Sequence, residues 1–201
     1  MVTLGGFLTS LNKTAVSKGF PVFIIPVGET FGVGLATISF VFALASSAGG
    51  PTGPVAGWLI DRHGPKAAVI LGATMSGVGF LVLGQTPNIW AFALVYVGLV
   101  TVGTNVGFSY AMSALVNNWF YRRKALAMSS FQAIDSSLPA VLVPVLALSI
   151  SVWGWQFTST AIGLVLLLVV PPLSFWIKNT PESMGLSMDG DSGADGPDTA
   201  I

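Results

Sequence analysis

The sequence predicts an all-α membrane protein with six transmembrane helices, and three observations lead to that fold class. Charged residues make up only 8% of the 201 residues, whereas soluble domains usually carry about 25%. Hydrophobic residues make up 53%, and the mean hydropathy is +0.80. No formal charge occurs from Val33 to Ile60 or from Ala67 to Tyr121. A water-soluble fold of this length could not cover so much apolar surface, so we expect the chain to lie in a lipid bilayer.

Six segments are long and apolar enough to cross a bilayer, which takes about 20 mainly apolar residues. In chain order they are predicted at residues 2–27, 35–59, 67–84, 89–116, 125–152 and 156–177. Short polar or turn-forming segments separate them: GETFGVG, IDRHGPK, QTPN, NNWFYRRK and WGW. Most of these connections contain Gly, Pro or Asn, which favour turns. Residues 1–178 are therefore expected to form one six-helix domain.

The basic residues predict the orientation of these helices, because cytoplasmic loops collect Lys and Arg. They lie in the second connection, in the fourth and after the sixth span: Arg62, Lys66, Arg122, Arg123, Lys124 and Lys178. The other three connections contain no basic residue. Both ends of the chain are therefore expected in the cytoplasm and the helices in the inner, or cell, membrane. Setting this topology is the main role expected for residues 122–124.

Residues 179–201 differ in composition from the rest of the chain. They hold five of the eight acidic residues and no strong apolar run. Such a composition is typical of disorder, so this segment is predicted to be a disordered cytoplasmic linker or tail.

The residues that usually carry enzyme chemistry are largely missing from the sequence. There is no cysteine, which excludes disulfides, thiolate nucleophiles and cysteine-based metal sites. His63 is the single histidine and has no companion ligands nearby in the sequence, so no metal site is expected. Phosphate-binding, nucleophile-elbow and HExxH motifs are also absent. We expect neither an enzyme nor a cofactor, and no basic cluster suggests a nucleic-acid partner.

The charged strip GWLIDRHGPK at residues 57–66 stands out within this apolar chain. It resembles the loop signature of the major facilitator superfamily, G-x-L-x-D-R-x-G-R-K, which follows the second helix in that family. The matching positions are Gly57, Leu59, Asp61, Arg62, Gly64 and Lys66. Pro65 stands where the family usually has a basic residue. The resemblance implies that Asp61 caps or pairs with neighbouring helix ends and that this loop latches one gating state.

Two further stretches narrow the resemblance to one branch of that family. WFYRRKALA at residues 119–127 resembles the signature after the fourth helix of monocarboxylate transporters. TPESMGLSMDG at residues 180–190 is similar to the start of the central loop in bacterial relatives, including oxalate/formate antiporters. The family has twelve helices, so the resemblance implies the N-terminal six-helix half of such a fold.

The function that this resemblance implies is secondary active transport of small organic anions such as monocarboxylates. Transport would proceed by alternating access, coupled to protons or by exchange. The alternative is a truncated or non-transporting membrane module that requires a second six-helix half or homodimerisation. Both alternatives have the lipid bilayer as partner.

Asp135 is the acidic residue expected deepest in the membrane. It follows Lys124 by 11 positions, or about 16 Å along a helix. A charge at that depth costs about 2.5–3.5 kcal/mol on insertion scales, so such residues usually face a cavity and have a function. One interpretation is a proton-coupling or substrate-binding site. The other is a protonated side chain that hydrogen-bonds a neighbouring helix.

Two lysines lie in the first predicted span. Lys18, in SKGFPVF, resembles the first-helix lysine of monocarboxylate transporters, which implies that it binds the substrate carboxylate. Its role in this chain stays open at this point. Lys13 is expected to extend toward a membrane interface through its long side chain. In an α-helix the two lysines would point about 140° apart and are not expected to share a site.

Small and polar residues predict where the helices touch one another. Gly103-x-x-x-Gly107 and Gly53-x-x-x-Gly57 are typical of closely packed helix faces. Asn12 and Asn105 are expected to form hydrogen bonds between helices rather than to contact a ligand.

Overall fold

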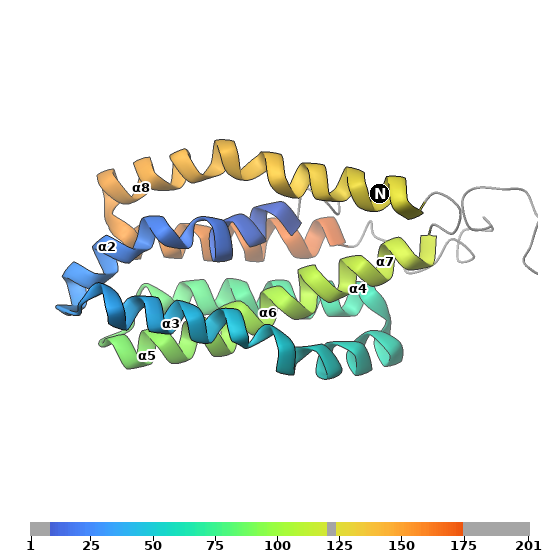
Figure 1. Cartoon of the computed structure of the whole chain (residues 1–201), viewed down its shortest axis with the longest axis horizontal. Coiled ribbons are helices and arrows are strands. Elements are labelled where there is room, and N and C mark those ends of the chain that lie inside the picture. The colour runs from blue at the N-terminus through green and yellow to red at the C-terminus, as the bar shows by residue number, and fades with distance from the viewer. Residues whose placement is uncertain (1–8, 120–123, 175–201) are drawn as a thin grey trace, which may run out of the picture.

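The protein is helical almost throughout, and the computed structural model describes residues 9–119 and 124–174. Its helical segments run side by side along one long axis (Figure 1). Three continuous stretches are long and apolar enough to cross a membrane: Leu35–Leu83, Ile89–Trp119 and Lys124–Ser174. The helix Phe20–Phe31 is apolar but shorter. The predicted all-α membrane architecture is confirmed at this level.

The first segment changes its helix type halfway along. Residues 9–13 are helical and lead into the π-helical turn η1 (Thr14–Lys18). The helix α2 (Phe20–Phe31) follows and ends at Gly32. Gly32 has a φ of 63°, the left-handed conformation that glycine adopts at helix ends without steric cost. The predicted start of this span at residue 2 lies outside the described residues.

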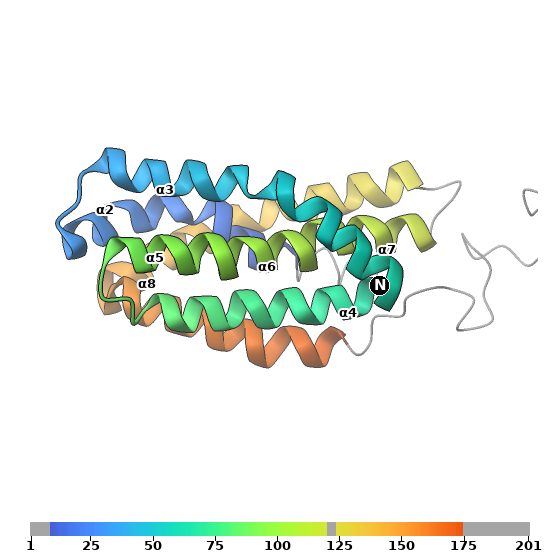
Figure 2. The same ribbon diagram turned by 90° about the horizontal axis from the view of Figure 1, so that it is seen from below.

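The second and third segments are separated by a break at a single residue inside a helix. Helix α3 (Leu35–Ser47) and the first limb of α4 (Gly49–Leu83) form the second segment, and the other limb of α4 forms the third. Inside α4, Gly64 takes φ 81° and ψ 160°, and the chain turns back on itself there (Figure 2). Only glycine enters this region readily. Pro65 then starts the returning limb, a position where proline loses no hydrogen bond and its fixed φ suits the helix.

The fourth segment is continuous but has two π-helical turns within it. Its parts are α5 (Ile89–Val95), η2 (Tyr96–Thr101), α6 (Val102–Thr104), η3 (Asn105–Tyr110) and α7 (Ala111–Trp119). The Asn88 side chain accepts a 2.8 Å hydrogen bond from the Ala91 N–H, which caps the start of α5. The segment predicted at residues 89–116 is confirmed, with its end three residues later.

Helix α8 (Lys124–Ser174) reverses at Gly154, which takes φ 82° and ψ 165°. The reversal occurs within the sequence WGW, where the connection between the fifth and sixth segments was predicted. It divides α8 into the limbs 124–153 and 155–174. The predicted end of the last segment, at residue 177, lies outside the described residues.

Glycines allow the closest approaches inside the bundle. A Cβ atom on Gly72 would lie less than 3 Å from backbone atoms of Gly103 and Gly107. The close packing predicted for Gly103 and Gly107 is therefore confirmed. For the second glycine pair the prediction is wrong at Gly57, where a Cβ would meet nothing within 4 Å in the described chain. Gly53 is different, because a Cβ there would lie 3.3 Å from the Tyr110 hydroxyl.

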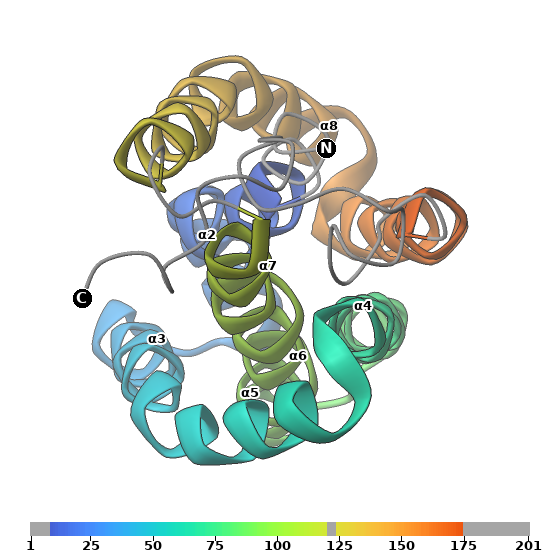
Figure 3. The same cartoon turned by 90° about the vertical axis from the view of Figure 1, so that its right-hand side faces the viewer.

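The connections gather at the two ends of the bundle. The reversal at Gly64 lies at the same end as the close of α7 and the start of α8, whereas the reversal at Gly154 and the turn after α2 lie at the other (Figures 1 and 2). Seen along the bundle, α2 and α7 lie toward the middle, between α8 on one side and α3 with α4 on the other (Figure 3). The first segment therefore contacts elements on both of its sides.

Candidate functional site

Asp135 lies on the 124–153 limb of α8, and its carboxylate faces the first segment. Its Oδ2 atom is 3.7 Å from Nζ of Lys13. The Asp135 side chain is 14% exposed and that of Lys13 is 28% exposed. Within the described chain, the Asp135 Oδ1 atom is buried and has no hydrogen-bond partner. The structure therefore places an ion pair inside the bundle with half of its carboxylate unsatisfied.

The partner of Asp135 is Lys13, a residue to which the sequence assigned no site role. Its fellow lysine, Lys18, is exposed at the end of η1. The signal that could have found the pair is simple: Lys13 and Asp135 are opposite charges within segments predicted to span the membrane. Intramembrane charges commonly pair with one another.

Ser10 holds the two segments together next to this pair. Its hydroxyl is 3.3 Å from the carbonyl oxygen of Ile134 and 3.5 Å from that of Asp135. Ser10 precedes Lys13 by three positions, so the two side chains share one helix face. The contact between the first segment and α8 therefore does not depend on the ion pair alone.

The π-helical turn changes the relation between the two lysines. The Gly19 N–H donates to the Thr14 carbonyl at 2.5 Å, an i→i+5 bond that adds one residue to the turn. Residue i+5 then lies about where i+4 lies in an α-helix, about 40° from residue i. The α-helical angle of about 140° between Lys13 and Lys18 therefore does not apply, and the lysines lie nearer to one face.

A polar hollow of about 250 Å³ lies on the side of the first segment that faces α3 and η2. Its lining residues come from four elements: Val16, Ser17, Phe42, Ala45, Ser46, Tyr96, Thr101 and Asn105. The Tyr96 hydroxyl donates a 2.6 Å hydrogen bond to the Val16 carbonyl and fixes one wall. Asn105 makes no hydrogen bond from its side chain within the described residues, so the prediction that it joins two helices is wrong.

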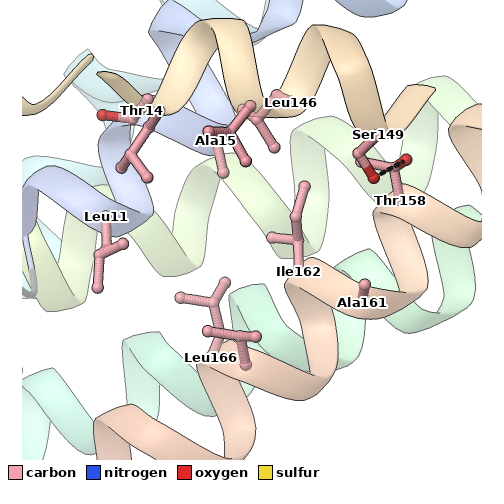
Figure 4. A pocket seen from close by; sticks show the side chains of 12 residues that line it. Leu11, Thr14, Ala15, Leu146, Ser149, Thr158, Ala161, Ile162 and Leu166 are labelled. Carbon is pink, nitrogen blue, oxygen red and sulfur yellow. Dashed lines mark hydrogen bonds between the residues drawn. The ribbon is translucent and has the colours of Figure 1, made fainter. Parts of the chain in front are cut away.

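A second hollow, of about 220 Å³, lies on the opposite side of the first segment, against both limbs of α8. Figure 4 shows Leu11, Thr14 and Ala15 facing Leu146 and Ile162 across it. Nearly all of its lining is aliphatic; its polar groups are Thr14 and the Ser149–Thr158 pair, whose hydroxyls are 2.9 Å apart. Neither hollow has a charged residue in its lining, but the 250 Å³ hollow has several hydroxyl groups and the Asn105 amide, which suit a small polar ligand better than the aliphatic lining does.

The charged strip at residues 57–66 forms the end of one helical limb and the start of the next. Asp61, Arg62 and His63 are exposed. The Arg62 guanidinium lies 5.6 Å from the ring centre of Trp58, within the range of a cation–π contact. Gly64 breaks the helix, and Pro65 is buried behind it.

The remaining predicted site residues differ in their contacts, and some of them lie outside the described chain. Asp61 makes no hydrogen bond or ion pair within residues 9–119 and 124–174, and Gly57 faces open space. Lys66 is half-buried and is engaged with a neighbour. Lys124 is exposed at the first position of α8. Arg122, Arg123 and the linker at residues 179–201 lie outside the described residues, and in the part described no three metal-ligating side chains come together.

Comparison with known proteins identifies the family. Residues 2–190 match the Major Facilitator Superfamily. The chain is 27% identical over 183 residues to an uncharacterized MFS-type transporter, YcxA, of Bacillus subtilis, covering 90% of this chain and 45% of that protein. It is 24% identical to the oxalate:formate antiporter of Oxalobacter formigenes (81% and 39% covered) and 21% identical to human monocarboxylate transporter 1 (83% and 33%). The chain therefore spans less than half the length of these relatives.

Proposed function

Because the chain belongs to the major facilitator superfamily and is an integral membrane protein, we propose that it moves small organic anions across the inner membrane by alternating access. The observation that carries this proposal is the buried carboxylate of Asp135 and its contact with Lys13. Ionisable side chains inside membrane segments are costly and commonly mark ion or proton pathways.

The proposed substrates are small carboxylates, monocarboxylates above all. Two relatives carry names that refer to oxalate, formate or monocarboxylates, which supports this class. Lys18 would bind the substrate carboxylate through its ammonium group, since charge-assisted hydrogen bonds are strong. Ser17, beside it in the chain, lines the polar hollow and offers a hydroxyl to the rest of the anion. Asp135 would carry the coupled proton.

The proposed topology has six membrane-spanning segments. The reversals at Gly64 and Gly154 divide the two longest stretches into antiparallel limbs, which supports six crossings rather than three. The basic residues of the described connections lie at one end of the bundle, at the reversal near Gly64 and at the start of α8 (Figure 1). By the distribution of basic residues in membrane proteins, that end would face the cytoplasm together with both chain termini and the 179–201 linker.

The loop strip is proposed to latch the cytoplasmic side. Asp61 is exposed and free of contacts in the described chain, so its carboxylate is open to a partner in another conformational state. Arg62 and Lys66 would supply the positive charges around it. Gly64 would allow the sharp reversal of the chain at this strip.

The proposal also includes a second wall of the substrate site, meaning a set of helices that faces this six-helix bundle across the bound anion. Major facilitator sites form near the bilayer midplane between two six-helix halves, and this chain spans 33–45% of its relatives' lengths. Either a second six-helix half or a second copy of this chain would close the substrate site. The alternative function, a membrane module that does not transport, would need no such wall.

Reconstitution into liposomes tests the proposed function. The chain is purified, its oligomeric state is fixed by crosslinking and mass measurement, and uptake of labelled formate, oxalate and lactate is followed. We expect uptake or exchange of at least one anion by dimers, or when a second six-helix half is supplied. Concentrative uptake by a demonstrated monomer would contradict the second wall. No flux in any assembly would favour the non-transporting module.

A further inference from the structure

The aliphatic hollow between the first segment and the two limbs of α8 has one polar end, at Ser149 and Thr158. We infer that this hollow binds the alkyl chain of a membrane-soluble aliphatic alcohol, whose hydroxyl donates a hydrogen bond to Ser149. The site lies on the other side of the first segment from the polar hollow. It goes beyond the proposed transport of anions and does not depend on it.

The walls of this hollow are aliphatic, and one side of it is open. Figure 4 shows Leu146 of the 124–153 limb and Ile162 of the 155–174 limb pointing into the same space. Val145 on one limb and Val165 on the other also line the hollow, and they are 54% and 47% exposed. Aliphatic side chains on the outside of membrane helices contact lipid tails. The hollow therefore opens sideways between the two limbs, where a molecule dissolved in the bilayer can enter.

The polar end can accept a hydrogen bond from a ligand but has none to donate. The Thr158 hydroxyl donates a 2.8 Å hydrogen bond to the Gly154 carbonyl, and it lies 2.9 Å from the Ser149 hydroxyl. Because each hydroxyl has a single hydrogen, the hydrogen between the two side chains comes from Ser149. The Ser149 oxygen keeps a lone pair and has no hydrogen left. A head group that meets it must therefore be a donor, as an alcohol is and as an ester or ether is not.

The depth of this polar end favours an uncharged head group. In the six-segment topology proposed above, the 155–174 limb is about 30 Å long, the thickness of the hydrocarbon core. The reversal at Gly154 then lies near one boundary of that core. Ser149 precedes Gly154 by five positions and Thr158 follows it by four, which places the pair about 6–8 Å inside the boundary. A charged head group would lose its hydration there, whereas an alcohol keeps a hydrogen bond at Ser149.

The volume of the hollow sets the size of the chain that it encloses. An engineered apolar cavity of about 150 Å³ binds benzene. If the six carbon atoms of benzene scale with volume, the hollow of about 220 Å³ holds about nine non-hydrogen atoms, as in 1-octanol. Water suits the site less well, because a buried water needs two to four polar partners. Thr14 lies at the far end of the hollow from Ser149 (Figure 4), and its hydroxyl oxygen is buried, so the chain meets no second polar group there.

Photolabelling with a defined probe tests this inference. The purified chain is placed in nanodiscs of saturated phosphatidylcholine, a lipid without a free hydroxyl, and is irradiated with an octanol that carries a diazirine on its chain. We expect mass spectrometry to find the adducts within residues 142–149 and 158–166, the ranges that contribute to the walls. At equal concentration in the bilayer, 1-octanol should compete with the probe about fivefold more strongly than octyl methyl ether. The ether cannot donate, and one hydrogen bond is worth about that factor.

Three variants separate the polar contact from the volume of the hollow. Ser149→Ala removes the acceptor, so 1-octanol and the ether should compete equally. Ala161→Leu fills part of the hollow and should lower labelling about fivefold or more, because close-packed atoms leave the probe no room. Ser151→Ala is the matched control and should label as wild type, since the Ser151 hydroxyl is exposed on the same limb and donates to the Leu148 carbonyl at 2.9 Å. Circular dichroism checks that each variant is folded.

The outcomes distinguish the ligand class from the site. If the ether competes as well as 1-octanol in wild type, or Ser149→Ala keeps the advantage of 1-octanol, the hydroxyl class is wrong. If no adduct forms, if adducts spread over outward residues such as Leu168, which is 70% exposed, or if Ala161→Leu labels as wild type, the hollow is not a binding site. None of these measurements involves an anion or its transport, so the proposed function stands or fails separately.

Discussion

The hydroxyl oxygen of Thr104 lies 2.6 Å from the amide oxygen of Asn12, and this contact joins the first helical segment to the fourth. The amide nitrogen of Asn12 donates a 3.1 Å hydrogen bond to the Ser76 hydroxyl on α4. All three side chains are fully or almost fully buried. One asparagine thus joins three helical segments, and it precedes Lys13, so it also fixes the helix that presents the ion pair.

We expect Asn12→Leu to destabilise the bundle by about 1–2 kcal/mol. Hydrogen bonds between membrane helices contribute on average about 0.6 kcal/mol each, with a maximum near 1.7, and Asn12 makes two such contacts. Unfolding in mixed detergent micelles, followed by circular dichroism, measures the change. Asn117→Leu is the matched control, because Asn117 is exposed on α7 and should change stability little. Equal effects of the two substitutions would contradict the bridging role.

The substitution Gly72→Ala should weaken the packing of α4 against the fourth segment. The added methyl group would meet backbone atoms of Gly103 and Gly107 at less than 3 Å, and backbone cannot move aside as a flexible side chain can. Overpacking of this kind typically costs about 1–3 kcal/mol. Thermal unfolding of the purified chain should therefore begin at a lower temperature.

Gly98→Ala is the control for this packing prediction. A Cβ at Gly98 would meet nothing within 4 Å, and alanine is the better helix former by up to about 1 kcal/mol. Its stability should stay the same or rise. If Gly72→Ala proves as stable as Gly98→Ala, the close approach is not needed for folding.

The helical segments were predictable because lipid imposes one simple rule on a long apolar chain. Backbone groups in the membrane must be satisfied within each segment, so apolar runs become helices. The breaks were visible as well, since Gly64 and Gly154 lie inside the short connections IDRHGPK and WGW. The positive φ at each explains why one residue is enough to reverse the chain.

The site was less predictable, because it depends on which faces the helices present. Lys13 and Asp135 are separated by more than a hundred residues, and no local pattern connects them. The π-helical turn η1 was also invisible to a reading based on 3.6 residues per turn, and it moves Lys18 toward the face of Lys13. Asn105 was predicted to form a hydrogen bond between helices, but it lines the polar hollow. A polar residue within an apolar segment can lie in a helix contact or in a hollow, and the sequence does not distinguish the two positions.

Asp61→Asn should slow substrate exchange more than it weakens substrate binding. Asp61 lies at an end of the bundle on the exposed strip, whereas Lys13 and Asp135 lie within the helical segments. Removing its charge should shift the balance between open states, an effect typically worth about 1–3 kcal/mol. Exchange of labelled formate in liposomes should fall by about fivefold or more, while the equilibrium affinity changes less than twofold. His63→Asn, at an exposed neighbour, serves as control. Loss of binding in a folded Asp61→Asn protein would refute the latch.

Single-cysteine labelling should place the two ends of the bundle on opposite sides of the membrane. The chain has no cysteine of its own, so each introduced thiol reports on one position. His63 is exposed beside the Gly64 reversal, and Gln85 is exposed in the connection before α5; these connections lie at opposite ends of the bundle (Figure 2). Because basic residues mark the cytoplasmic side, a membrane-impermeant maleimide added to intact cells should label Gln85→Cys but not His63→Cys. Permeabilised cells should label both, which shows that each thiol is reactive. The reverse pattern in intact cells would invert the proposed orientation, and labelling of both would mean that the two connections share one side.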